Sequence, residues 1–237
     1  MRKLVAILPL VLTTIFVYLL DKPLGKLPAI GRLLDPVNGC WASAEPTNRS
    51  FDLQLQLPGL KQAVEVKFDD RLVPHIKAAT EHDIYYVQGY IHAYFRLWQM
   101  DMQTRAAAGR ISEVAGEKAL KFDRGQRRKG MVYGAEQSLK AMEAEPRSKE
   151  MLDAYSAGIN YYISQLNYRA YPLEYKLMGF KPEAWTNIKT ALLLKYMADD
   201  LTGYTEDIAM TVLRDMLSPA KFDLLYPSRM EGSDTVI

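Results

Sequence analysis

One long helical pattern, between Thr80 and Gly109, constrains the fold of this chain more than any other feature of its sequence. Apolar residues recur there at the three- and four-residue spacing that places them on one face of a helix. These residues are Ile84, Val87, Ile91, Tyr94, Phe95, Trp98 and Met102. Thr80, with Asp83 three residues later, is typical of a helix start, and Gly109 is suited to end one. The pattern predicts a single amphipathic helix from about Glu81 to Ala108.

Two short segments with alternating apolar and polar residues precede this helix. The first runs from Val64 to Phe68, and after a break at residues 69–71 the second runs from Leu72 to Ile76. This pattern predicts a β-hairpin or two edge strands, where Pro74 is tolerated. Further helices are expected at about 111–118, 131–145, 148–166, 187–200, 205–217 and 220–225. The predicted fold class is therefore α+β and predominantly helical, with a short N-terminal hairpin.

The N-terminus has the pattern of an export signal. Arg2 and Lys3 precede an apolar stretch from Leu4 to Leu20. As a helix this stretch is roughly 26 Å long, slightly short of a typical bilayer core, so a cleaved signal and a retained anchor both stay open. No cleavage site with small residues follows Leu20 directly, which favours an uncleaved anchor. Residues 21–62, rich in Pro, Gly, Asn and Ser, are interpreted as a linker with a short helix near 29–34.

Composition excludes several classes of protein. The 237 residues are 49% hydrophobic and 24% charged, which is typical of a globular protein and not of a disordered one. A formal net charge of +2 gives no electrostatic footprint for nucleic acid. The single cysteine, Cys40, excludes an internal disulfide framework and a multi-cysteine metal site. Cys40 lies too far beyond the apolar stretch for a lipid-receiving cysteine, so it is interpreted as an ordinary thiol.

General catalytic signatures are absent from the sequence, which contains no G-x-S-x-G, H-E-x-x-H, C-x-x-C or Gly-rich phosphate loop. His75, His82 and His92 are close in sequence, and histidine is a common catalytic group and metal ligand. On one helix, His82 and His92 would point about 80° apart, a spacing that does not build a metal site by itself. Capping, packing and hydrogen bonding are therefore preferred for all three, with a ligand or catalytic role as the alternative.

Five polar residues, Arg96, Gln99, Arg105, Arg110 and Glu113, lie in and just after the long helix. A buried arginine must be paired, because desolvation of an isolated charge is costly. The preferred interpretation is that paired arginines here join the helix to the sheet, and the alternative is direct contact with a substrate.

Several motifs in this region together resemble the N-terminal part of the penicillin acylase (penicillin amidase) family. They are Val73-Pro74-His75-Ile76, Gly89-Tyr90-Ile91-His92-Ala93, Arg96-Leu97-Trp98-Gln99-Met100, Gly109-Arg110 and Glu113-Val114-Ala115-Gly116. The resemblance extends over about Val64 to Leu225. It implies the α-chain portion of an N-terminal-nucleophile hydrolase with the αββα fold. In that family the precursor cuts itself into an α chain and a larger β chain, whose first residue is the nucleophile.

The resemblance also implies site residues in the segment from Met197 to Asp207, which is similar to an α-chain segment of the family's best-known members. By position, Met197 and Leu201 would bind substrate in the acyl pocket. Leu201 stands where those enzymes have an aromatic ring, which puts specificity for aromatic acyl groups in doubt. Asp207, or Glu206 with a one-residue slip, would supply a carboxylate to a structural calcium ion shared with the β chain.

Two departures from the family pattern indicate a divergent branch. Leu72 occupies the place usually held by Gly before the Val-Pro-His-Ile run, and Phe95 stands where Asp often precedes Arg96. Neither departure removes one of the implied site residues.

These observations predict a signal or anchor at residues 1–20, a linker at 21–62 and an α-chain-like domain at 63–237. The expected function is the α region of an exported, periplasmic amide hydrolase, membrane-anchored through residues 4–20. Its partner would be the β chain, with no organic cofactor and no nucleic acid. No catalytic residue is expected in this chain, since Ser233 lies in a polar tail, so it would be inactive alone. The alternative is a non-catalytic, membrane-anchored helical binding module.

Overall fold

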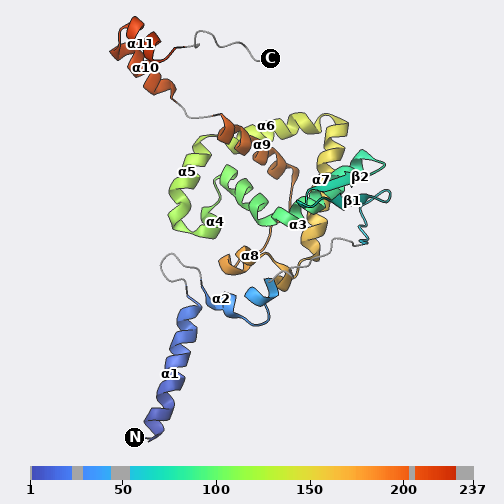
Figure 1. Ribbon diagram of the computed structural model, residues 1–237, viewed down its shortest axis with the longest axis vertical. Coiled ribbons are helices and arrows are strands. Elements are labelled where there is room, and N and C mark those ends of the chain that lie inside the picture. Colours follow the sequence, from blue (N-terminus) through green and yellow to red (C-terminus); the bar gives the residue numbers. More distant parts are fainter. Residues whose placement is uncertain (1, 23–28, 44–53, 203–205, 228–237) are drawn as a thin grey trace. The chain divides into compact units, whose positions relative to one another are not determined.

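The computed structural model describes residues 2–22, 29–43, 54–202 and 206–227, and this part of the chain is mostly helical with one two-stranded sheet (Figure 1). The α-helices are α1 (Arg2–Leu20), α2 (Gly31–Leu34), α3 (Glu81–Ala108), α4 (Ser112–Ala115), α5 (Leu120–Arg128), α6 (Met131–Glu143), α7 (Pro146–Gln165), α8 (Leu173–Met178), α9 (Asn187–Leu201), α10 (Asp207–Met216) and α11 (Pro219–Leu225). Short 3-10 helices are η1 (Cys40–Ser43), η2 (Glu117–Ala119) and η3 (Tyr168–Ala170). The strands are β1 (Glu65–Phe68) and β2 (Pro74–Lys77). Two compact units, Met1–Met197 and Ala198–Ile237, divide the chain.

The long helix α3 has the bounds that its sequence pattern predicted. The side-chain hydroxyl of Thr80 accepts a hydrogen bond from the Asp83 backbone N–H at 3.2 Å, which caps the start of the helix. Gly109 ends it in the left-handed conformation, with φ of 63°. A single break, at Arg96 with φ of −137°, divides α3 into an N-terminal half beside the hairpin and a C-terminal half.

Helix α7 packs against α3 at close range, as Figure 1 shows for the centre of the first unit. Two glycines permit this approach. A Cβ atom added to Gly89 would lie 2.2 Å from the Tyr155 carbonyl oxygen, and one added to Gly158 would lie 1.9 Å from the Tyr86 carbonyl oxygen. The buried core at this contact combines residues of α3 and α7 with Tyr175 of α8 and with Trp185, which precedes α9. Its members are Ala93, Leu97, Met100, Ile159, Tyr175 and Trp185.

A second buried cluster joins the C-terminal end of α3 to α6 and α9. Its buried members are Ala107, Ala108, Met131, Ala135, Ala191 and Leu192. Beside it, the buried carboxylate of Asp123 on α5 accepts hydrogen bonds from the backbone N–H groups of Ile111 and Ser112 at 3.0 and 2.7 Å. Arg127 donates to the Gly109 carbonyl oxygen at 2.9 Å. Helix α5 thereby fixes the turn that follows α3.

The predicted hairpin is present, and β1 pairs with β2 in antiparallel register with Val66 opposite Ile76. Its turn carries the unusual Leu72, which has a φ of 61° and is the non-glycine residue with positive φ among the described residues. L-residues other than Asn and Asp rarely adopt this conformation, because Cβ approaches the following carbonyl oxygen. The departure from Gly at this position therefore leaves the left-handed turn in place.

Several helix boundaries differ from those predicted. Helix α7 begins at Pro146, earlier than expected, because Pro fits the first helical turn and the Glu145 side chain accepts hydrogen bonds from the Arg147 and Ser148 backbone N–H groups. Helices α5 and α8 were not predicted, since nine and six residues are too few to show a clear helical period. The expected helices at 187–200, 205–217 and 220–225 correspond to α9, α10 and α11.

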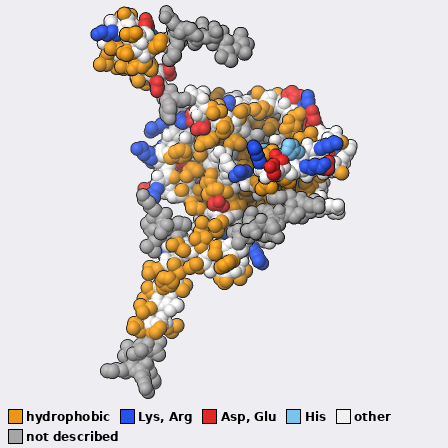
Figure 2. Space-filling view, in the orientation of Figure 1, with side chains coloured by type: hydrophobic (Ala, Val, Ile, Leu, Met, Phe, Trp, Pro, Cys, Tyr) orange, Lys and Arg blue, Asp and Glu red, His pale blue; other side chains and the backbone are white. Residues whose placement is uncertain are grey.

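The N-terminal apolar stretch forms α1, along which hydrophobic side chains lie on the surface (Figure 2). Within the described part of the chain, no helix combines the length and the apolar character needed to cross a membrane. The segment predicted as a linker contains α2 and η1. The second unit contains α10 and α11, where Arg214 lies over the ring of the buried Phe222 at 5.1 Å.

Candidate functional site

Helix α9 carries the two residues that the sequence assigned to an acyl pocket. Its start is fixed by Asn187, whose side-chain amide donates to Glu143 at 3.0 Å and to Asp153 at 2.7 Å. Ser156 donates to the amide oxygen of Asn187 at 2.6 Å. Side chains of α6 and α7 therefore anchor the N-terminal end of α9.

The C-terminal half of α9 turns an apolar face outward. Met197 is 39% exposed and Leu201 is 77% exposed. Leu194, three residues before Met197, is 50% exposed and lies on the same face of the helix. Sequence reasoning missed Leu194, although its spacing to Met197 and Leu201 follows the helical period. The three residues form a partly exposed apolar stripe along α9.

Glu206 and Asp207, the predicted calcium ligands, lie at the start of α10. Both side chains are exposed, and Asp207 is the first residue of the helix. No group of three acidic, histidine or cysteine side chains able to hold a metal occurs among the described residues. Calcium takes six to eight oxygen ligands, so these two carboxylates do not form a site by themselves.

A buried ionic cluster surrounds Arg105 on α3, which is 3% exposed. Its guanidinium contacts three carboxylates: Asp101 at 3.0 Å, Glu113 at 3.0 Å and Glu183 at 2.7 Å. Arg105 also lies over the Phe180 ring, 5.3 Å from its centroid. Each of the three guanidinium nitrogens of Arg105 therefore contacts a carboxylate of the protein.

Three further side chains extend this cluster. Arg110 contacts Glu113 at 2.7 Å and Glu183 at 2.9 Å, and the ammonium of Lys189 lies 3.2 Å from Glu183. The Tyr175 hydroxyl donates to Asp101 at 3.1 Å, and burial raises the pKa of that hydroxyl. Burial alone would raise the pKa of the Glu183 carboxyl, but the hydrogen bonds from Arg110 and the positive charges of Lys189 and Arg105 outweigh burial and hold this pKa at about 2.

This ionic cluster corrects one sequence-based expectation. The paired arginines join α3 to α4 and to the segment before α9, and not to the sheet. Arg96 and Gln99, which were grouped with them, are exposed and lie outside the cluster. Arg105 is fully engaged, and the ionic cluster fixes the path by which the chain enters α9.

The three histidines have separate partners. His75 lies 3.7 Å from Asp69, His82 lies 3.1 Å from Asp83, and Nδ1 of His92 lies 2.9 Å from the Tyr155 hydroxyl. Burial lowers the pKa of His92 and raises the pKa of Tyr155 to about 12. These contacts agree with the expected packing and hydrogen-bonding roles.

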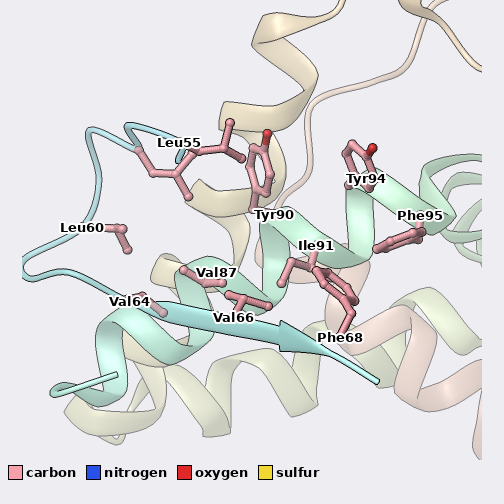
Figure 3. A pocket seen from close by; sticks show the side chains of 11 residues that line it. Leu55, Leu60, Val64, Val66, Phe68, Val87, Tyr90, Ile91, Tyr94 and Phe95 are labelled. Atoms are coloured by element: carbon pink, nitrogen blue, oxygen red, sulfur yellow. The ribbon is translucent and has the colours of Figure 1, made fainter. Parts of the chain in front are cut away.

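An apolar pocket of about 160 Å³ lies between β1, α3 and the segment before β1, as Figure 3 shows. Its lining residues are Leu55, Leu57, Leu60, Val64, Val66, Phe68, Val87, Tyr90, Ile91, Tyr94 and Phe95. The rings of Phe68 and Phe95 meet edge to face at 5.8 Å. Phe95, which replaces the Asp of the family pattern, thus packs β1 against α3. Its lining side chains carry no charge, and their polar groups are the hydroxyls of Tyr90 and Tyr94.

Comparison with known proteins places this geometry in a family. The chain is 40% identical over 131 residues to penicillin acylase 2 proenzyme of Pseudomonas sp. (strain SE83), a match covering 55% of this chain and 16% of the relative. It is 33% identical over 184 residues to the acyl-homoserine lactone acylase QuiP of Pseudomonas syringae pv. syringae (strain B728a), covering 77% of this chain and 22% of the relative. The chain therefore spans about a fifth of the length of these curated relatives.

A solved structure agrees with the sequence relatives. The thermostable penicillin G acylase from Alcaligenes faecalis matches with a TM-score of 0.62 and 26% sequence identity, over 74% of this chain and 97% of that chain. The family model described as penicillin amidase matches residues 63–236. Because this match extends over well more than half of the sequence, the chain belongs to the penicillin amidase family.

Proposed function

We propose that this chain is the α region of an amide hydrolase and works together with a β chain that carries the nucleophile. One observation carries the proposal. The chain matches 97% of one chain of a solved penicillin G acylase but only 16% and 22% of the curated relatives, one of which is named a proenzyme. The αββα layers that the family resemblance implies would be completed by the β chain.

The proposed substrate is a linear, non-peptide amide with an acyl group. The relatives are named as acylases of penicillin and of acyl-homoserine lactones. Met197 and Leu201 would line one wall of the acyl pocket, extended by Leu194. Their exposure in this chain supports this role, since a pocket wall shared between two chains has its apolar side chains uncovered in one chain alone.

In such an enzyme the chemistry would belong to the β chain. Its N-terminal residue would attack the amide carbonyl, with its own α-amino group as base, and β-chain donors would stabilise the oxyanion. The α region would supply the pocket wall and the ionic cluster that orients α9. Residues 1–237 alone would therefore be inactive.

A structural calcium site is proposed only for the two-chain enzyme. Glu206 or Asp207 would contribute one carboxylate, and the β chain would have to supply most of the other ligands. Export to the periplasm is likewise proposed, from Arg2, Lys3 and the apolar stretch that follows them.

The test is expression of a precursor in which residues 1–237 are followed by whatever coding sequence lies downstream of the Ile237 codon. The expected result is a split into two chains that purify together and release the amine from a phenylacetyl or acyl-homoserine lactone amide. Replacement of the first β-chain residue by Ala should abolish this release. A precursor that stays in one piece, or two chains that hydrolyse no acyl amide, would contradict the proposal. An amide that binds residues 1–237 alone would favour the binding module instead.

A further inference from the structure

An exposed apolar surface lies on the short segment between α1 and the hairpin. It is formed by Leu34, Val37 and Trp41, whose side chains are 60%, 59% and 77% exposed. These three residues are here called the footing. Beside them Tyr168 and Met178, on elements that contact η1 and α2, are 46% and 38% exposed. Figure 2 shows hydrophobic side chains gathered over the part of the first unit where Figure 1 places α2 and α8.

The segment that carries the footing is held against the helical body. Ala29 and Gly39 are buried, α2 contacts α8, and η1 contacts η3. A Cβ atom added to Gly39 would lie 2.2 Å from the Leu33 carbonyl oxygen, so the turn is tight. The apolar side chains of the footing are thus presented outward by a packed segment.

The segment that carries the footing holds one acidic and one basic residue. Asp35 is the acidic residue of segment 29–43, and its carboxylate accepts hydrogen bonds from the Val37 and Asn38 backbone N–H groups at 2.8 and 3.1 Å. Arg32 is the basic residue of the same segment. A Trp beside aliphatic residues and a basic residue is the combination that favours the interface between lipid headgroups and acyl chains.

The neighbouring end of α1 carries the same kind of signal. Phe16 and Tyr18 are 61% and 62% exposed, and the Lys22 ammonium lies 5.1 Å from the centroid of the Tyr18 ring. An aromatic ring and a lysine at the end of an apolar helix are typical of the membrane interface. Six residues lie between Lys22 and Ala29, so the two positions are at most roughly 25 Å apart along a fully extended chain. The footing therefore lies within reach of any bilayer surface that holds the end of α1.

We infer that the footing binds the surface of a lipid bilayer, with Trp41 inserted at the headgroup level. The helical body would then contact the membrane surface directly through the footing, in addition to any contact that α1 makes. This inference goes beyond the proposed function, since it concerns lipid binding and does not depend on amide hydrolysis.

The fluorescence of Trp41 can be used to test whether the footing enters the bilayer. The other two tryptophans are Trp98, which is partly buried, and Trp185, which is 3% exposed. The full chain is mixed with vesicles of phosphatidylcholine and phosphatidylglycerol brominated near the top of the acyl chains. We expect quenching of tryptophan emission in the wild type and its loss in Trp41→Phe.

A charged double variant separates the footing from α1. Leu34→Glu with Val37→Glu leaves Trp41 and α1 unchanged, so the chain should still co-sediment with vesicles while the Trp41 quenching falls to the level of Trp41→Phe. The matched control places the same charges on α6, as Val132→Glu with Tyr133→Glu, at positions 37% and 69% exposed. This control should keep full quenching.

Cys40 provides an independent measurement, because it is exposed and is the single cysteine of the sequence. A nitroxide label on Cys40 should gain access to oxygen and lose access to an aqueous nickel complex when vesicles are added, and the footing variant should reverse both changes. Three outcomes would overturn the inference. They are unquenched Trp41 in a vesicle-bound chain, quenching that survives the two glutamates, and a wild-type chain that self-associates through this surface and leaves lipid unbound.

Discussion

Gly158 on α7 lies so close to Tyr86 on α3 that a Cβ atom at position 158 would stand 1.9 Å from the Tyr86 carbonyl oxygen. Gly89 on α3 faces the Tyr155 carbonyl oxygen in the same way. The two helices that form the centre of the first unit therefore meet backbone to backbone. Tyr175 of α8 packs in the same core as residues of α3 and α7, so its position depends on the distance between these two helices.

The first prediction concerns this contact. Gly158→Ala should destabilise the chain by about 3 kcal/mol, at the upper end of overpacking effects, because the atom it meets is backbone and cannot turn aside. Gly125→Ala is the matched control, since a Cβ atom at Gly125 in α5 would meet nothing within 4 Å. The control should be neutral or stabilise by up to about 1 kcal/mol through helix propensity. Urea unfolding followed by circular dichroism measures both, and equal stability of the two variants would contradict the prediction.

The second prediction concerns the hairpin turn. Leu72 has a φ of 61°, a conformation that costs a branched L-residue roughly 1–2 kcal/mol. Leu72→Gly should therefore stabilise the chain by about 1 kcal/mol, with part of the gain lost to the greater freedom of Gly in the unfolded state. Leu72→Asn should also stabilise, whereas Leu72→Ala should not, because Ala retains the Cβ clash. Thermal unfolding of the three variants gives the order, and a stabilising Ala would show that side-chain exposure matters more than backbone strain.

The third prediction concerns the ionic cluster. Arg105→Met should destabilise by about 3–5 kcal/mol, because it removes the cationic partner of the buried Asp101 carboxylate and one of the three cationic partners of Glu183. Arg147→Met is the matched control, since Arg147 pairs with Glu81 on the surface and both side chains are more than half exposed. The control should cost at most about 1 kcal/mol. A similar loss in both variants, measured by chemical unfolding, would contradict the structural role of Arg105.

The fourth prediction is a pH dependence. The carboxyl of Glu183 has a pKa of about 2 in the folded chain, below the value of about 4.3 in an unfolded chain. A carboxyl group whose pKa is lower in the folded chain than in the unfolded chain stabilises the fold. This stabilisation is complete when the pH is above the pKa of the unfolded chain, and it is lost as the pH falls towards the pKa of the folded chain. The free energy of unfolding should therefore decline between about pH 5 and about pH 2.

Glu183→Gln should flatten this decline without abolishing it. The buried Asp83 also has a pKa of about 2, since hydrogen bonds from the Lys61 backbone N–H, His82 and neighbouring groups outweigh the opposing effect of burial. Unfolding curves at a series of pH values measure the slope. A Glu183→Gln variant with the full wild-type slope would show that other carboxyl groups cause the acid sensitivity.

The fifth prediction rests on the proposed function and uses the processed two-chain enzyme. Leu201→Phe should shift the ratio of kcat/KM values towards aromatic acyl amides, by a factor of about 10 or more if the ring fills a pocket wall. Leu224→Phe in α11, where the side chain is 80% exposed, is the matched control and should leave the ratio unchanged. Unchanged selectivity in Leu201→Phe would remove Leu201 from the acyl pocket while leaving the amide hydrolase proposal intact.

Most helices, the hairpin and the family of this protein could be predicted from its residues alone. The Thr80 cap, the apolar spacing along α3 and the Gly109 stop are signals between near neighbours, and here they were sufficient to place both ends of the helix. The hairpin followed from alternation over a few residues. The motifs from Val73 to Gly116 indicated the penicillin amidase family, which the match over residues 63–236 confirmed.

Contacts between residues far apart in the sequence could be identified from the folded chain but not from local patterns. Arg105 could be recognised as needing a partner, but its partner Glu183 comes from a segment far along the chain, so the arginines join helix to loop and not helix to sheet. The contact between Gly158 and Tyr86 likewise depends on how two helices cross. Leu194, Met197 and Leu201 could be placed on one helix face from their spacing, whereas their exposure depends on what packs against α9. Contacts between distant segments arise from the folded packing of the whole chain, which no local pattern of residues specifies.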